Sequence, residues 1–238
     1  MIDLRRTAWA LALASALAGC GSSSEPEQQA PAQQSSGAEM RAPHESMQVT
    51  GLMGTISTHK IEMALEPKLP KFAQCFARAA QRVEQIAGGM KFYFRVGLDG
   101  RVEWVYPRES NVGDRATEQC LLEVARGTRF PEPQGGGAAE VTWSFEIDGS
   151  DDVRAPLAWE ADKVSNAVAQ NRDAVTSCGE GAFSITTYIA PGGQVLAAGA
   201  ATDSQDAAGR IDCVVEAVKS WSMPDPGSYP AKVTFSAP

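Results

Sequence analysis

Apolar residues recur at near-helical spacing in two stretches of the chain. The first set is Ile61, Leu65 and Phe72, and the second is Val164, Val168 and Val175. Residues that follow one another at intervals of three, four or seven share one face of a helix. We therefore predict a helical segment before Cys75 and another before Cys178.

Prolines and glycines set the limits of the first helical segment. It should break near Pro67 and restart at Pro70, because proline is tolerated only in the first turn of a helix. The apolar pattern continues through Val83 and Ile86. We expect the helix to run on to the Gly88-Gly89 pair, which is a helix-stopping signal.

Each helical segment is followed by a stretch with a period of two. The alternating apolar positions are Phe92, Phe94 and Val96 in the first case and Ile185, Thr187 and Ile189 in the second. This period indicates a half-buried strand. Asp99-Gly100 and Gly192-Gly193 then predict hairpin turns, because they tolerate positive φ. Second strands should follow near residues 101–106 and 194–198.

The same order continues to the end of each half. Gly100 precedes Cys120 by the interval at which Gly193 precedes Cys213, and both cysteines open apolar helical runs. Next come Phe130-Pro131-Glu132-Pro133 and Met223-Pro224-Asp225-Pro226, and then apolar strands at 141–147 and 232–235. The spacing therefore indicates an internal repeat.

The repeat predicts an α+β fold of two tandem α-β-β-α-β units. Each unit should be a three-stranded antiparallel sheet with two helices on one face. The expected organisation is a signal peptide at 1–19, a tether at 20–50, domains at 51–148 and 158–238, and a linker at 149–157.

Composition excludes several classes of function. The formal charge is −8, whereas nucleic-acid binding needs clustered Lys and Arg. Only two His occur, and no Cys-x-x-Cys does, so a His-based metal site or a Ser-His-Asp system has little to draw on. Acidic residues are scattered, and no Gly-rich phosphate loop follows a strand. We expect no enzyme, no metal and no cofactor.

The N-terminus has the order of an export signal. Arg5 and Arg6 precede an apolar stretch at 7–17 that is too short to span a bilayer stably. The stretch ends in Leu17-Ala18-Gly19-Cys20, which resembles the lipobox of bacterial lipoproteins. That resemblance implies a lipidated Cys20 after cleavage. An ordinary cleaved signal, with Cys20 incidental, is the alternative.

The segment after Cys20 is rich in Ser, Gln, Glu, Pro and Ala. It holds almost no large apolar residue, so we expect a disordered tether. Lipoprotein sorting also implies that Gly21, where Asp would favour the inner membrane, favours the outer one. The expected location is the cell envelope, lipid-anchored to the outer membrane and facing the periplasm.

Four cysteines remain after Cys20, and exported proteins meet an oxidising compartment. Of the three possible connectivities, the repeat selects Cys75–Cys120 and Cys178–Cys213, because each pair then lies within one unit. We expect structural staples between the two helices of a unit. A labile regulatory disulfide, or a metal or catalytic role, stays open.

The order of elements resembles the TonB C-terminal-like fold. The residues are closer to the AgmX/PglI C-terminal domain family of deltaproteobacterial envelope and gliding-motility proteins. The matching features are Gly51-Leu52-Met53-Gly54-Thr55, Phe72-x-x-Cys75-Phe76, Asp99-Gly100, Gly113-Asp114-x-x-x-Glu118-x-Cys120, and Phe130-Pro131-x-Pro133 with Gly135-Gly136. Residues 158–238 match only in spacing and look like a degenerate copy. The resemblance implies a periplasmic binding or scaffold module, without catalytic residues.

Several residues are candidates for partner binding. Trp104 and Tyr106 alternate with Val105 on one strand and form an exposed pair if that face is open; core or domain-interface packing is the alternative. Phe130, Pro131 and Pro133 form either a binding surface or a rigid connector with Phe130 in the core. Residues 51–55 should pack under the sheet and cap the helix through Thr55, Ser57 or Thr58. The last strand is a candidate edge for strand addition.

These observations favour a non-enzymatic envelope lipoprotein that binds or scaffolds envelope proteins or cell wall, within a gliding-motility or secretion assembly. Two alternatives are kept. One is a redox-responsive envelope sensor that uses the two cysteine pairs. The other is a cell-wall polysaccharide binder that uses Trp104 and Tyr106.

Overall fold

The structure, a computed structural model, describes residues 53–238. The predicted signal peptide, the lipidation site Cys20 and the predicted tether lie outside these residues. We call residues 53–147 the first half and residues 157–238 the second half.

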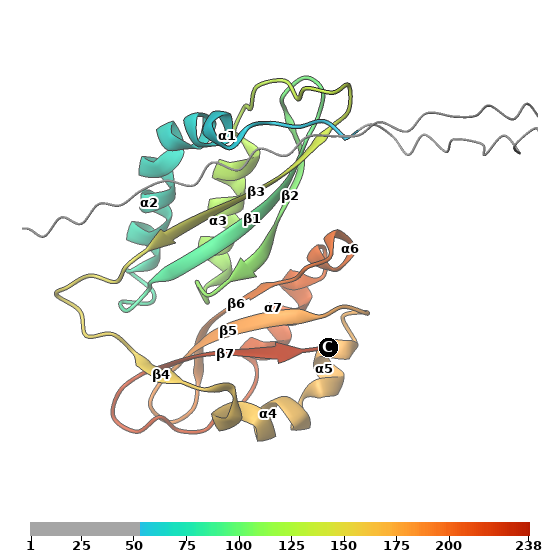
Figure 1. The fold of residues 1–238 in the computed structure, drawn as a ribbon. Coiled ribbons are helices and arrows are strands. Elements are labelled where there is room, and N and C mark those ends of the chain that lie inside the picture. Colours follow the sequence, from blue (N-terminus) through green and yellow to red (C-terminus); the bar gives the residue numbers. More distant parts are fainter. Residues whose placement is uncertain (1–52) are drawn as a thin grey trace, which may run out of the picture. The chain divides into compact units, whose positions relative to one another are not determined.

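The first half folds in the order helix, strand, strand, helix, strand. Its elements are α1 (Thr58–Leu65), a 3₁₀ turn (Glu66–Lys68), α2 (Leu69–Ala79), β1 (Gly88–Val96), β2 (Val102–Ser110), α3 (Arg115–Arg126) and β3 (Ala139–Ile147). The strands form an antiparallel sheet in the order β2-β1-β3. In Figure 1 the helices lie together on one side of this sheet.

The second half repeats this order behind one additional short strand. Its elements are β4 (Leu157–Trp159), a 3₁₀ helix (Ala161–Val164), α4 (Ser165–Gln170), α5 (Arg172–Thr176), β5 (Phe183–Ile189), β6 (Val195–Ala201), α6 (Gln205–Ala208), α7 (Ile211–Lys219) and β7 (Ala231–Ala237). The sheet order is β4-β7-β5-β6, and β4 runs parallel to β7. The three-stranded prediction is therefore wrong here, because residues 157–159 join the closing strand.

The α+β class is confirmed, and the three strands β2-β1-β3 of the first half and β6-β5-β7 of the second are antiparallel and share one order. They also share a backbone contact at the hairpin turn. The Phe130 N–H donates to the Gly100 carbonyl at 2.9 Å, and the Met223 N–H donates to the Gly193 carbonyl at 2.9 Å. Both glycines have positive φ, 76° and 82°. A Cβ at either would come within 2.1 Å of the carbonyl oxygen of Phe130 or Met223, so glycine is required at both positions.

The predicted helix through Val83 and Ile86 is wrong. α2 ends at Ala79, and turns follow in which the Val83 N–H bonds to Ala79 and the Ile86 N–H to Val83. Both side chains are buried all the same. The helix has to end before Gly88, because β1 begins there and pairs with β3 at Ile147. Residues in successive turns can therefore point into the core at the same spacing as residues on one face of a helix.

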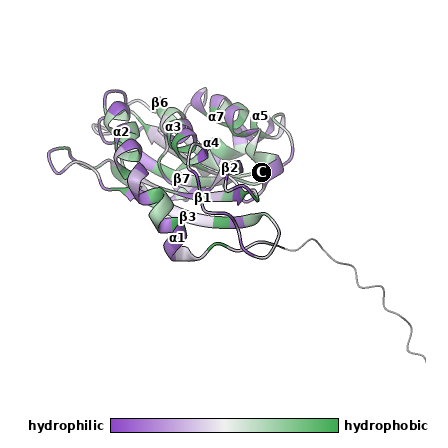
Figure 2. Ribbon diagram, turned by 90° about the horizontal axis from the view of Figure 1, so that it is seen from above, coloured by the Kyte–Doolittle hydropathy of each residue, from purple (hydrophilic) through white to green (hydrophobic). Residues whose placement is uncertain are grey.

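Two further helices differ from the prediction. α3 begins at Arg115 rather than at Cys120, because Asp114 caps it by accepting from the Thr117 N–H at 3.1 Å. The helical segment before Cys178 is divided, with α4 and α5 separated at Asn171. Figure 2 shows hydrophobic and hydrophilic residues alternating along the helices, as expected of elements that bury one face.

β5 is buried on both faces, so the prediction of a half-buried strand is wrong for it. Ile185 and Ile189 face the core of the second half, whereas Tyr188 belongs to the core of the first. The Tyr188 hydroxyl accepts from the Ala87 N–H at 3.2 Å, and the Thr186 hydroxyl donates to the Ser110 carbonyl at 3.3 Å. The second sheet is thus covered by its own helices on one face and by the first half on the other.

Candidate functional site

Both disulfides that the repeat predicts are present. Cys75–Cys120 joins α2 to α3, and Cys178–Cys213 joins the turn after α5 to α7. The two bridges therefore hold the same pair of helical segments in each half. No group of three His, Cys, Asp or Glu side chains in residues 53–238 is close enough to hold a metal ion.

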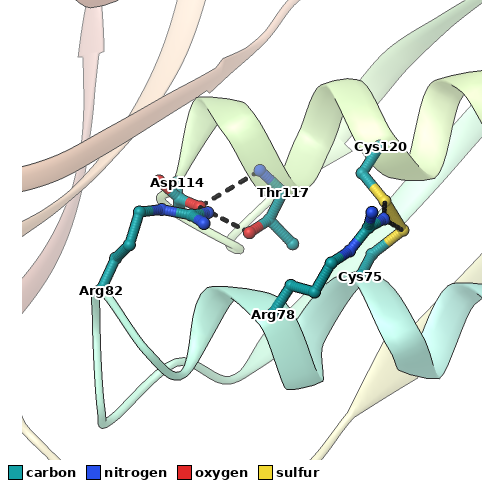
Figure 3. The surroundings of a disulfide bond; sticks show 6 residues. All are labelled: Cys75, Arg78, Arg82, Asp114, Thr117 and Cys120. Atoms are coloured by element: carbon teal, nitrogen blue, oxygen red, sulfur yellow. Dashed lines mark hydrogen bonds and ion pairs between the residues drawn. A yellow bond between two sulfur atoms is a disulfide. The ribbon is translucent and has the colours of Figure 1, made fainter.

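The guanidinium of Arg78 lies against the first bridge (Figure 3). Arg78 Nη2 lies 2.6 Å from Cys120 Sγ and 3.8 Å from Cys75 Sγ. Beside it, Arg82 Nη2 lies 2.6 Å from Asp114 Oδ2. Within residues 53–238, no side chain donates a hydrogen bond to the sulfurs of Cys178–Cys213. The twin bridges thus differ in this hydrogen bond, although the Arg210 side chain lies beside Gly179, the residue after Cys178.

Trp104 and Tyr106 lie on the face of the first sheet that points away from its helices. They form a cluster with Tyr93, with ring centroids 5.6–5.7 Å apart. Tyr106 is only 5% exposed, and its hydroxyl donates to the Asp203 carbonyl of the second half at 3.2 Å. Trp104 is half-buried. The two residues are therefore not an exposed pair, and Tyr106 packs at the contact between the halves.

The proline segment serves as a connector whose first residue is in the core. Phe130 is 3% exposed, and its ring meets Phe94 edge-on at 5.4 Å. Pro131 and Pro133 follow it and are half-buried. Phe130 therefore contributes no surface to a partner. Whether Pro131 and Pro133 contact one stays a prediction.

Each half begins with a short arm that pairs with the start of its closing strand. The Gly54 N–H donates to the Ala138 carbonyl at 3.0 Å, and the Leu157 N–H donates to the Pro230 carbonyl at 2.9 Å. Ser57 is the N-cap of α1 but makes no side-chain capping bond, so that part of the prediction is wrong. β4 is the counterpart of the first arm, although its sequence carries none of the Gly-Leu-Met-Gly-Thr pattern.

The arm of the second half leaves the end of β7 open. β4 pairs only with Ala231–Val233, whereas β7 continues to Ala237. Within the described residues no strand lies beside residues 234–237 on this side. Because the Pro230 carbonyl faces β4, and bonding direction alternates along a strand, the N–H groups of Thr234 and Ser236 face this open side.

A mainly apolar groove of about 570 Å³ lies between α4 and the open end of β7. Its lining residues are Ala161, Ser165, Val168, Ala169, Arg172, Phe235, Ser236, Ala237 and Pro238. Arg172 carries the only charged side chain among them. The sequence analysis named the last strand as a candidate edge but missed this groove, because no motif marks it. The available signal was the small side chains at 161, 165 and 169.

A second feature that the sequence analysis missed is the fully buried carboxylate of Glu118 on α3. Its Oε1 accepts from the Ser110 hydroxyl at 2.7 Å, and its Oε2 accepts from the Ala200 N–H at 3.1 Å. Burial raises the Glu118 pKa to about 7, against the opposing effect of Ser110, Arg115 and Ala200. The carboxylate joins the halves and is inaccessible, so it has no direct role in binding.

No helix among residues 53–238 is long and apolar enough to cross a bilayer. No family model, no curated protein and no solved structure matches the chain. The function must therefore be argued from the geometry of the molecule itself.

Proposed function

We propose that this chain is a non-enzymatic binding module of the cell envelope that captures an extended segment of a partner protein by strand addition at residues 234–237 of β7. The observation that carries the proposal is an open strand end beside an apolar groove. In strand addition, main-chain hydrogen bonds give affinity and neighbouring pockets give specificity.

Thr234 and Ser236 supply the backbone groups for such a segment. Each net hydrogen bond contributes about 0.5–1.5 kcal/mol, so a few of them alone bind weakly. The groove between α4 and β7 supplies apolar surface for the side chains of the added segment. The other exposed edge of the second sheet is not equivalent. The Ala200 N–H on β6 bonds to Glu118, and the N–H of Thr202, just after β6, bonds to Pro107, so the C-terminal end of that edge is occupied.

The location and anchoring belong to the same proposal. The lipobox supports a lipid anchor at Cys20, and the polar segment at 21–50 supports a tether that carries the module into the periplasm. The resemblance to the AgmX/PglI C-terminal domain family supports tandem TonB-C-like domains, the second one degenerate. A place in a gliding-motility or secretion assembly follows from the same resemblance.

Of the two alternatives, the redox-responsive sensor has a specific observation in its favour. Arg78 lies against the sulfurs of Cys75–Cys120, and a cation beside a cysteine stabilises its thiolate. The polysaccharide binder has less support, because Tyr106 is covered by the second half.

Selection of displayed twelve-residue peptides on the full-length protein tests strand addition. Ser236→Pro removes one N–H on the open side and leaves the pairing with β5 intact, because proline is tolerated where the N–H faces outward. Ser236→Ala keeps the N–H and is the matched control. We expect selected peptides to bind the wild type and Ser236→Ala and to lose binding to Ser236→Pro. Failure to select any peptide, or equal binding to all three proteins, would overturn the proposal.

A further inference from the structure

The internal repeat allows the positions around the groove in the second half to be compared with the equivalent positions in the first half. Phe92 pairs with Trp143 in the first sheet as Ile185 pairs with Phe235 in the second. Two residues further along the closing strands, Phe145 corresponds to Ala237. The matched disulfides place Phe72 opposite Val175 and Phe76 opposite Gly179.

In the first half, aromatic rings fill the space between the first helices and the end of the closing strand. The Phe145 ring lies 5.0 Å from Phe72 and 6.2 Å from Phe76, centroid to centroid. Trp143 completes the cluster, 5.4 Å from Phe72. The first half thus fills this place with its own side chains.

In the second half each of these four positions carries a smaller residue. Phe145 is replaced by Ala237, Phe72 by Val175, Phe76 by Gly179, and Trp143 by Phe235. Interiors are close-packed, so loss of several rings from one place leaves room unless the neighbours collapse. Of these four positions, Phe235 and Ala237 line the groove of about 570 Å³ at this end of β7. Val175 is fully buried in the core, and the Arg210 side chain fills the place beside Gly179, where an added Cβ would lie 2.8 Å from Arg210 Nε.

We infer that the groove between α4 and β7 takes an aromatic side chain from the added segment, whose ring replaces the one that Phe145 supplies in the first half. This inference rests on the proposed strand addition for the source of the ring. The ring site itself is a property of the groove and can be tested separately.

The chemistry of the lining fits an aromatic ring. Val168, Phe235 and Ala237 offer apolar contact, and Ser165 and Ala161 are small enough to admit a ring. Within residues 53–238 no carboxylate pairs with Arg172. Its guanidinium is therefore available to the face of a bound ring, a contact that favours aromatic over aliphatic side chains. The same charge disfavours Lys or Arg in the segment.

The first test uses defined peptides, acetyl-Thr-Thr-Xaa-Thr-Thr-amide with Xaa as Phe, Leu, Ala or Lys, titrated against the full-length protein by NMR. We expect Phe to bind at least tenfold more tightly than Ala, and Lys to be weakest. Ala237→Phe restores the missing ring and should abolish the preference. Ala169→Phe fills the groove from an exposed position on α4, and it replaces Ala237→Phe if that variant fails to fold.

The second test uses indole, which has no backbone to add to the strand. We expect indole to shift the resonances of Val168 and Ala237 in the wild type but not in Ala169→Phe. If indole binds and no peptide does, the aromatic site stands and strand addition fails. If the peptides bind without preferring Phe, strand addition stands and the aromatic site is overturned. If neither indole nor any peptide binds, both are overturned.

Discussion

The carboxylate of Glu118, on α3 of the first half, accepts a hydrogen bond from the backbone N–H of Ala200 on β6 of the second half, at 3.1 Å. β6 is an edge strand, and its unpaired N–H groups would otherwise be a site for uncontrolled strand pairing. Thr202 is satisfied by Pro107 in the same way. The first half therefore closes the C-terminal end of one edge of the second sheet and leaves the end of β7, at the other edge, open.

The burial of this carboxyl group predicts how stability depends on pH. The Glu118 pKa is raised from 4.5 to about 7, so the folded state holds a proton more tightly than the unfolded state. Its effect on the free energy of unfolding is therefore constant below pH 4.5, falls between pH 4.5 and 7, and is constant again above. The expected loss across that window is on the order of 3 kcal/mol. Urea unfolding at several pH values measures it.

Glu118→Gln is the control for that pH profile. Glutamine accepts from Ala200 without carrying a charge, while Arg115 and Asp114, the nearest charged groups, stay in place. The difference in unfolding free energy between variant and wild type should shift in favour of Gln as the pH rises from 4.5 to 7. A difference that does not change with pH would show that Glu118 titrates normally.

Gly199 permits the contact between the halves. A Cβ at this position would lie 2.3 Å from Glu118 Oε1, so Gly199→Ala must displace the carboxylate from Ser110 and Ala200 or shift β6. We expect a loss of about 1–3 kcal/mol in unfolding free energy, the cost of buried polar groups left unpaired. Gly209→Ala is the matched control, because no atom lies within 4 Å of its added Cβ. Equal effects of the two substitutions would contradict the argument.

How far the sequence could predict the fold is shown by Thr187 and Tyr188. The strand β5 could be predicted from Ile185, Thr187 and Ile189, because the face that they share packs against the helices of the second half. The opposite face was read as solvent-facing, although Tyr188 is buried in the core of the other half. Nothing local in the sequence distinguishes a face covered by a distant segment from one covered by water. A period of two in the apolar residues identifies a strand, but it does not identify which part of the molecule covers each face of that strand.

The candidate site was less accessible to sequence reasoning than the disulfides. The cysteines are few, and their spacing repeats, so their pairing followed from the repeat. The groove depends on what Ala237 and Phe235 lack relative to Phe145 and Trp143, and this comparison needs the strand register. β4 was missed for a similar reason, since a three-residue strand has too few positions to show a period.

Both disulfides should contribute similarly to stability. They close loops of 45 and 35 residues in sequence separation, for which the chain-entropy estimate is about 4 kcal/mol each. Cys75→Ala/Cys120→Ala and Cys178→Ala/Cys213→Ala, compared by urea unfolding, should therefore lose similar amounts. A loss below about 1 kcal/mol for one pair would mean that the native state relaxes when that bridge is removed.

The guanidinium of Arg78 should make the two bridges unequal toward reductants. A dithiol reductant breaks the S–S bond, is itself oxidised to a disulfide, and leaves two protein thiols. A neighbouring cation stabilises the thiolate form and so raises the reduction potential of the bridge. Arg78→Gln should therefore make Cys75–Cys120 harder to reduce and leave Cys178–Cys213 unchanged. Alkylation and peptide mapping across a series of dithiothreitol redox buffers measures each midpoint separately.

Because Arg78 is exposed, screening by salt limits its effect on the reduction potential, and the effect should shrink as salt is added. An unchanged midpoint at low salt would remove the one observation that favours a redox-responsive role.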